Sequence, residues 1–129
     1  MIEAENEVAT MQYDVKESIL YINIRVGCEM TKENLVKHYS DIRELTKGER
    51  YFAVIDVSNY YSISDAGMRY AATKEALEKR AAVAYFNPCL ANKISINFLK
   101  VRHQIEIPFS IFESRNEALK WIEKLKNKN

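Results

Sequence analysis

The chain has 129 residues, of which 47% are hydrophobic and 29% are charged. These values are typical of one globular domain with a single core, and no second domain fits within this length. Lysine plus arginine number 19 against 18 aspartates plus glutamates, which gives a formal net charge of +1. This balance creates no overall field that would attract nucleic acid or an anionic membrane, and it disfavours both as partners.

The first ten residues, MIEAENEVAT, are acidic and lack the apolar core of a secretory signal. No uninterrupted apolar run approaches the roughly 20 residues that a membrane helix needs. We therefore expect a cytoplasmic domain over residues 1–129, ordered from about 7 to 125, with no transmembrane segment. Cys28 and Cys89 are far apart and lack a CxxC motif or a paired histidine. This pattern predicts two small free thiols rather than a disulfide or a zinc site.

Two segments of alternating polarity open the predicted fold. Residues 7–15 and 19–26 each place apolar side chains on one side, which predicts a β-hairpin. Thr31 is the expected N-cap of an amphipathic helix that ends at Gly48. Its apolar residues follow the i, i+4, i+7, i+10 spacing: Leu35, Tyr39, Ile42 and Leu45.

Residues 51–57 are almost continuously apolar, which predicts a central parallel strand covered on both faces. A polar turn follows at residues 58–62. Ser64 is the expected N-cap of the next helix, with Asp65 in its first turn, and this helix is expected to run to about Lys79. Ligands and partners of open α/β sheets usually bind where a strand ends in such a loop. The sequence therefore places the candidate site here.

Residues 81–86, AAVAYF, predict the next strand. Asn87 as N-cap and Pro88 as the first helical residue predict a third helix, because proline lacks the N–H that would have no partner there. The apolar side of this helix is expected at Leu90, Ile94, Phe98 and Val101. A basic loop is expected at residues 100–104.

The last predicted elements are a strand over residues 107–112 and a helix. Pro108 cannot donate to a ladder, which places this strand at a sheet edge or the proline at its start. Ser114 and Glu117 form a capping box, and the buried stripe of the last helix is expected at Ala118, Trp121 or Ile122, and Leu125. The order is β, β, α, β, α, β, α, β, α. We therefore predict an α/β fold with a mixed five-stranded sheet, an N-terminal antiparallel hairpin followed by parallel strands, and four helices.

The segment VIDVSNYYSISDAGMRYAA resembles the core of the STAS fold, the domain of anti-sigma-factor antagonists, in which a strand leads to a D-S-S-G helix start. The second half is similar to the STAS/SEC14-like branch, with an "NP" helix start and a late element formed here by Phe112, Ser114, Glu117, Ala118, Trp121 and Ile122. The resemblance covers nearly the whole chain and implies a SpoIIAA-like fold. Members of this branch include small uncharacterised bacterial proteins.

One departure from the family pattern bears on regulation. In the antagonists, the second serine of D-S-S-G is phosphorylated, and the added charge breaks the complex with the partner. Aligned without gaps, Ser64 stands at the aspartate, Asp65 at the first serine and Ala66 at the phosphorylated serine. Alanine has no hydroxyl, so this switch cannot operate at Ala66, although Asp65 supplies a fixed charge nearby. Ser62 and Ser64 remain as alternative acceptors, or serve only as loop and cap residues.

The sequence shows no recognisable catalytic or metal-binding pattern. His38 and His103 lie outside any catalytic spacing and are interpreted as solvated surface residues. Asp56 is the best-placed acid, and we expect it to accept backbone N–H bonds from the turn at residues 58–60. The three glycines form no phosphate-binding loop. We therefore predict no enzyme activity, no cofactor and no metal.

Two binding hypotheses rest on aromatic and apolar side chains. In the first, a non-enzymatic regulatory or scaffolding module binds a protein partner, or a second copy as a homodimer, through the loop and helix start after the central strand. In the second, a lipid or other small apolar ligand enters a SEC14-like pocket between the sheet and the third helix, although core packing explains the same residues. A nucleic-acid role would rest on Lys100, Arg102 and His103 alone, which is too small a patch.

The predicted binding residues follow the ends of two neighbouring strands: Asp56, Ser58, Tyr60, Tyr61, Ser64, Asp65, Tyr70 and Asn87. Tyr85 and Phe86 end the next strand and are expected beside these tyrosines, forming an aromatic rim. The alternative is that half of the aromatic residues belong to the core.

Overall fold

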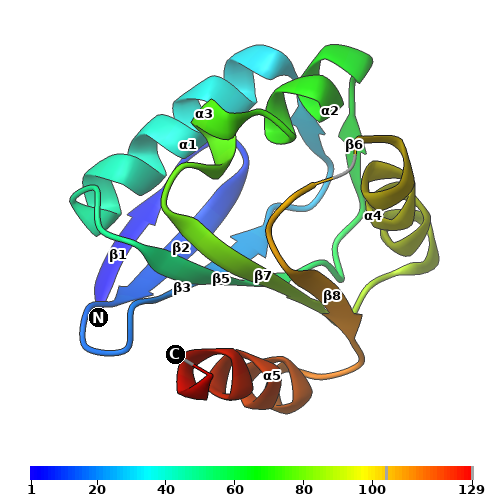
Figure 1. Ribbon diagram of the computed structural model, residues 1–129. Helices are drawn as coiled ribbons and strands as arrows, with labels where there is room; N and C mark the ends of the chain where they lie inside the picture. The colour runs from blue at the N-terminus through cyan, green and yellow to red at the C-terminus, as the bar shows by residue number, and fades with distance from the viewer. Residues whose placement is uncertain (104, 129) are drawn as a thin grey trace.

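A six-stranded sheet forms the centre of the computed structural model, which describes residues 1–103 and 105–128 (Figure 1). The strands lie in this order: β1 (Ile2–Glu5), β2 (Ala9–Asp14), β3 (Ile19–Ile24), β5 (Tyr51–Asp56), β7 (Arg80–Phe86) and β8 (Phe109–Phe112). The pairs β1–β2 and β2–β3 are antiparallel, and all later pairs are parallel. A small parallel sheet joins β4 (Cys28–Met30) to β6 (Tyr61–Ile63).

Helices cover both faces of the large sheet. On one side lie α1 (Lys32–Thr46), α2 (Asp65–Ala71) and α3 (Lys74–Leu77), and on the other lies α5 (Arg115–Asn127) (Figure 1). Alternate residues of β5 face the two layers: Tyr51, Ala53 and Ile55 pack with α1, whereas Phe52 and Val54 pack with α5. The helix α4 (Leu90–His103) adds Ile96 to the first layer. No helix among the described residues is long and apolar enough to cross a membrane.

The predicted mixed sheet is confirmed, and the structure adds elements that the sequence analysis did not predict. The strands β1, β4 and β6 are three or four residues long, too short to show a clear period. The helix expected up to Lys79 is divided into α2 and α3 by Thr73, whose Oγ1 accepts a hydrogen bond from the Ala76 backbone N–H at 3.2 Å and so caps a new helix.

The predicted start of the third helix is wrong by a few residues. Asn87 is exposed with a φ of 55°, and its N–H donates to the Phe112 carbonyl, so it forms a turn after β7 instead of an N-cap. The helix begins at Leu90, beyond Pro88. The segment predicted as a basic loop is helical up to His103, because lysine and arginine are good helix formers and suit a C-terminal end. Gln104 lies outside the described residues.

The predictions for the C-terminal region are confirmed with one adjustment. Pro108 precedes β8, which is an edge strand of the sheet. Ser114 caps α5, accepting the Glu117 N–H at 3.2 Å. The Glu117 carboxylate accepts from the backbone N–H of Glu113 at 3.1 Å, one residue earlier than in a standard capping box.

Candidate functional site

The helix start predicted after the central strand is present at α2. Ser64 is the N-cap, and its Oγ accepts the Gly67 N–H at 3.0 Å. The Ser64 N–H donates to the Met30 carbonyl in β4 at 3.2 Å, and a Cβ at Gly67 would overlap that same carbonyl oxygen. Glycine is therefore required by the close approach of β4. Asp65 is exposed and places its charge at the positive end of the helix.

Side chains hold the loop between β5 and β6 in place. The half-buried Asp56 accepts the N–H of the exposed Ser58 at 2.9 Å, which confirms the predicted role of Asp56 in the turn. The Asn59 side chain donates to the carbonyl of Ile24 at 3.0 Å and so ties the loop to β3. These two hydrogen bonds fix the loop to the end of the sheet at β5 and β3.

Asn92 joins the same loop to α4. Its side chain is fully buried and donates to the carbonyls of Val57 at 2.8 Å and Asn59 at 2.7 Å. Its Oδ1 accepts the Tyr61 N–H at 3.4 Å. The polar atoms of a buried amide are satisfied by these bonds, which fix the rotation of α4. No sequence pattern points to Asn92, because a single asparagine in a helix gives no spacing signal.

The predicted aromatic rim is not assembled. Tyr60 is 58% exposed, but Tyr61 and Tyr70 are buried in the core, so the prediction that these two bind a partner at the surface is wrong. Pairing of β6 with β4 turns Tyr61 inward. Tyr85 and Phe86 pack on opposite faces of the sheet. The alternative reading, in which part of the aromatic set is core, describes these residues better.

Instead, α4 presents apolar side chains to solvent. Four of them are between 49% and 81% exposed and form what we call the α4 stripe: Leu90, Ile94, Phe98 and Val101. At 100° per residue they fall within roughly 80° of one another on the helix. The buried side of α4 holds Asn92 and Ile96. The predictions that the stripe is the buried side of this helix, or lines a pocket beneath it, are therefore wrong.

Basic side chains accompany the α4 stripe. The helix contains Lys93, Lys100 and Arg102 and has no aspartate or glutamate. The Arg102 guanidinium carbon lies 5.7 Å from the centre of the Phe98 ring. Exposed apolar residues that share one side of a helix mark interaction surfaces more often than isolated ones do.

A groove of about 310 Å³ lies between α2 and α4. Its lining comes from both helices: Asp65, Met68, Arg69, Phe98, Arg102 and His103. The helix start predicted from the sequence therefore adjoins the stripe that the sequence analysis assigned to the core. We call the groove together with the α4 stripe the α2–α4 surface.

A second candidate site lies beneath α1. Two cavities, of about 60 Å³ and about 30 Å³, share the lining residues Tyr39, Ala71, Arg80, Tyr85 and Leu99. Arg80 is only 5% exposed. Its Nε donates to the Tyr51 hydroxyl at 3.0 Å, while its buried Nη2 has no hydrogen-bond partner. Within residues 1–103 and 105–128, no carboxylate forms an ion pair with this guanidinium.

His38 lines the larger cavity and is buried, so the prediction of a solvated histidine is wrong. Its Nδ1 faces the Asn6 side-chain nitrogen at 3.1 Å, and that nitrogen also donates to Asp41 at 3.0 Å. The Asn6 oxygen accepts two backbone N–H bonds, which fixes the orientation of the amide. Burial, followed by the charge of Arg80, lowers the pKa of His38 to about 3. The ring is therefore neutral and carries its proton on Nε2.

The tyrosines around the cavity are neutral as well. Burial raises the pKa of Tyr85 to about 12 and raises the pKa of Tyr61 further. Arg80 is therefore the charged group among the cavity residues. Burial also raises the pKa of the Cys28 thiol, and both Cys28 and Cys89 are free, as predicted.

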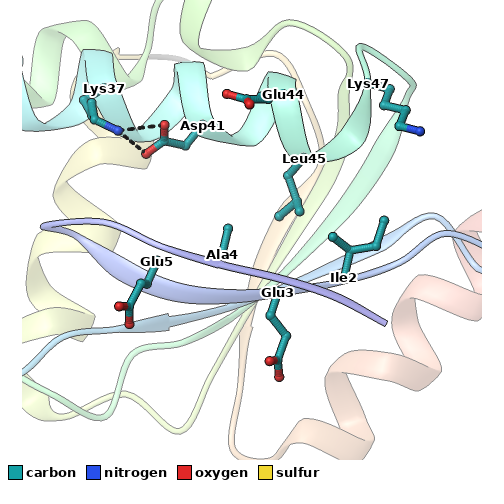
Figure 2. A pocket seen from close by; sticks show the side chains of 9 residues that line it. All are labelled: Ile2, Glu3, Ala4, Glu5, Lys37, Asp41, Glu44, Leu45 and Lys47. Carbon is teal, nitrogen blue, oxygen red and sulfur yellow. Dashed lines mark hydrogen bonds and ion pairs between the residues drawn. The ribbon is translucent and has the colours of Figure 1, made fainter.

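A third hollow, of about 360 Å³, lies between β1 and α1 (Figure 2). Ala4 and Leu45 point toward each other across it, and Glu3 points away. Lys37 and Asp41 form an ion pair at 2.9 Å on the helix above. Four acidic side chains and two lysines line this hollow, and one of each is engaged in the Lys37–Asp41 ion pair. No cluster of three or more potential metal ligands occurs among the described residues.

Comparisons with known proteins agree on the fold. The structure is similar to the crystal structure of an uncharacterized protein from the DUF3478 family with a SpoIIAA-like fold, from Shewanella loihica PV-4. The two share 15% sequence identity with a TM-score of 0.61, over 86% of this chain and 89% of that chain. The expected SpoIIAA-like fold is thereby confirmed. No curated protein matches the chain. A family model described as a domain of unknown function, DUF7793, matches residues 13–126, and the chain therefore belongs to that family.

Proposed function

We propose that this domain is a non-enzymatic interaction module whose α2–α4 surface binds an acidic amphipathic helix of a partner protein. The main support for this proposal is the exposure of the α4 stripe to solvent. A surface helix normally turns its apolar side toward the core, yet here the inward side holds Asn92 and Ile96 while the stripe stays in water. A partner that covered the stripe would remove this apolar area from water.

The charge of α4 supports an acidic partner over a second copy of the chain. Lys93, Lys100 and Arg102 lie on a helix without acids, so two copies packed through α4 would bring like charges together. Glutamates or aspartates beside the apolar face of a partner helix would pair with these side chains. Binding of such a helix in a groove is a common mode of peptide recognition.

The apolar-ligand hypothesis has less support at the place where the sequence analysis put it. Leu90, Ile94 and Phe98 face solvent, and the inward side of α4 holds Asn92 and Ile96, together with Leu99, which lines the cavities beneath α1. A non-enzymatic role also agrees with the position of Asp56, whose carboxylate is engaged by the turn.

A peptide titration tests the proposal. The ¹⁵N-labelled protein is titrated with a synthetic helical peptide that has a leucine stripe flanked by glutamates, and with the same peptide carrying lysines instead. We expect saturable shifts in α2 and α4 with the acidic peptide alone, weakening as salt increases. The double change Ile94→Ser with Phe98→Ser should abolish them, whereas Thr10→Ser, an exposed change on β2, should not.

Three results would overturn the proposal. The acidic peptide fails to shift α4 resonances, or both peptides bind equally, or the serine variant binds as well as the wild type. Sedimentation of the free protein adds a fourth: a dimer that the same serine changes disrupt would assign the surface to a second copy instead.

A further inference from the structure

Arg80 presents an unusual electrostatic situation. A buried charge without a counter-ion is unfavourable, because the protein interior replaces little of the hydration that the ion has lost. Arg80 is 5% exposed, its guanidinium keeps its charge at any physiological pH, and the Nη2 atom has no hydrogen-bond partner. Among the neighbouring groups that could carry negative charge, Tyr39 and Tyr85 are neutral phenols, because burial raises the pKa of both hydroxyls.

Arg80 is also held in a fixed orientation. Its Nε donates to the Tyr51 hydroxyl at 3.0 Å, and its guanidinium carbon lies 5.1 Å from the Tyr39 ring centre and 5.5 Å from the Tyr51 ring centre. These contacts engage the Nε of the guanidinium and place its carbon over two aromatic rings. An ordered guanidinium with a free terminal nitrogen at a cavity is suited to an anion.

We propose that the cavity beneath α1 binds a short-chain monocarboxylate, with Arg80 as its counter-ion. A carboxylate matches the planar guanidinium and brings one negative charge to one positive charge. A dianion such as sulfate would leave a charge uncompensated, because the other polar lining residues, among them His38, are neutral.

The size and lining of the cavity set the length of the ligand. Its volume of about 60 Å³, at about 10–15 Å³ for each water-sized group, leaves room for a few heavy atoms, which suits a small anion such as acetate or propionate. Apolar side chains line the rest of the space: Val8, Ile22, Leu35, Ile55 and Val57. They would surround a short alkyl group, and the His38 and Tyr61 side chains add neutral polar groups beside it. This site is separate from the α2–α4 surface and does not depend on the proposed partner.

Sodium propionate is the first probe. The ¹⁵N-labelled protein is titrated with propionate, chloride or sulfate at constant ionic strength, and the Nε–H resonance of Arg80 is followed. We expect a saturable shift with propionate, together with a rise in the unfolding temperature. In Arg80→Met the rise should disappear, with binding weaker by roughly tenfold or more. Arg115→Met is the matched control, because Arg115 also stacks on an aromatic ring, Tyr21, but is exposed and should respond as the wild type does.

A guanidinium that is solvated by buried water alone would give no saturable shift, and this result would overturn the proposal. Equal responses to chloride or sulfate would overturn the assignment to carboxylates. A propionate effect that survives in Arg80→Met would remove Arg80 from the site. If Arg80→Met does not fold, the proposal is tested on the wild type alone, by comparing the shifts of the Arg80 Nε–H resonance with propionate, chloride and sulfate.

Discussion

The helices α4 and α5 differ in what covers their apolar sides. On α5, Ala118 and Ile122 are fully buried against the second face of the sheet. On α4, the stripe that includes Ile94 and Val101 faces solvent, and a buried asparagine occupies the side toward the core. Apolar spacing along a helix thus shows that an apolar side exists, but it does not show whether the sheet of the same chain covers that side.

The difference has a local cause. The side of α5 that faces away from the sheet carries Lys120, Glu123 and Lys124, so only one side of this helix can be buried. The second side of α4 offers Asn92 and Ile96, and the Asn92 amide finds backbone partners in the loop after β5. Two sides of α4 therefore compete for the core, and hydrogen bonding decides between them.

The largest expected effect is a difference in protein stability between equivalent substitutions on α5 and α4. Ile122→Ala on α5 should lower the free energy of unfolding by about 2–5 kcal/mol, because it leaves a cavity in a fully buried site. Ile94→Ala on α4 should change it by less than about 0.5 kcal/mol. Urea denaturation of both variants measures the difference, and similar losses would show that the α4 stripe is part of the core.

Asn92 should be the polar residue on which the orientation of α4 depends most. Asn92→Ala leaves the Val57 and Asn59 carbonyls without this partner, and we expect a loss of about 2–3 kcal/mol in urea denaturation. Asn97→Ala, at an exposed site on the same helix, is the control and should be nearly neutral. A loss below about 0.5 kcal/mol at Asn92 would contradict the role given to its amide.

The buried histidine predicts an acid-sensitive region beneath α1. His38 has a pKa of about 3 when folded, against 6.5 as its ordinary value, so between these pH values the unfolded chain binds a proton that the folded chain does not. Its contribution should be constant above pH 6.5 and be lost as pH falls, by up to about 1.4 kcal/mol per pH unit. His38→Gln should flatten the pH dependence of the unfolding free energy in this window.

The smallest expected effect tests the helix start beside α4. Ser64→Ala removes the N-cap of α2 and should cost about 1 kcal/mol in thermal or urea unfolding. Ser62→Ala, at an exposed position of β6, should lie within about 0.5 kcal/mol of the wild type. Equal losses of unfolding free energy in the two variants would show that the Ser64 cap does not stabilise α2.

Local signals explain which parts of the fold could be predicted from the sequence. The caps at Thr31, Ser64 and Ser114 depend on a few neighbouring residues, and each is present in the structure. The apolar run of β5 and the hairpin of β2 and β3 were likewise predicted. The pairing of β4 with β6 could not be predicted, because three-residue strands carry no recognisable period.

The candidate sites depended on tertiary packing to a greater extent. The sequence indicated the α2 start. The exposure of the α4 stripe, in contrast, depends on hydrogen bonds from Asn92 to the carbonyls of Asn59 and Val57, which lie 33 and 35 residues away in the chain. Arginine and histidine side chains are seldom fully buried in proteins, so residue type alone would place Arg80 and His38 at the surface. Their burial results from strand and helix packing, and no spacing in the sequence indicates it.

Site-specific photo-crosslinking in the native host tests the central claim most directly. A photoreactive amino acid replaces Ile94 on α4 in one variant and the exposed Lys124 on α5 in another. We predict one discrete crosslinked product at position 94 and none at position 124, with the crosslinked segment of the partner carrying acidic residues beside an apolar stripe. No product at position 94, the same product at both positions, or a basic crosslinked segment would contradict the claim that α4 is an interaction surface for an acidic helix.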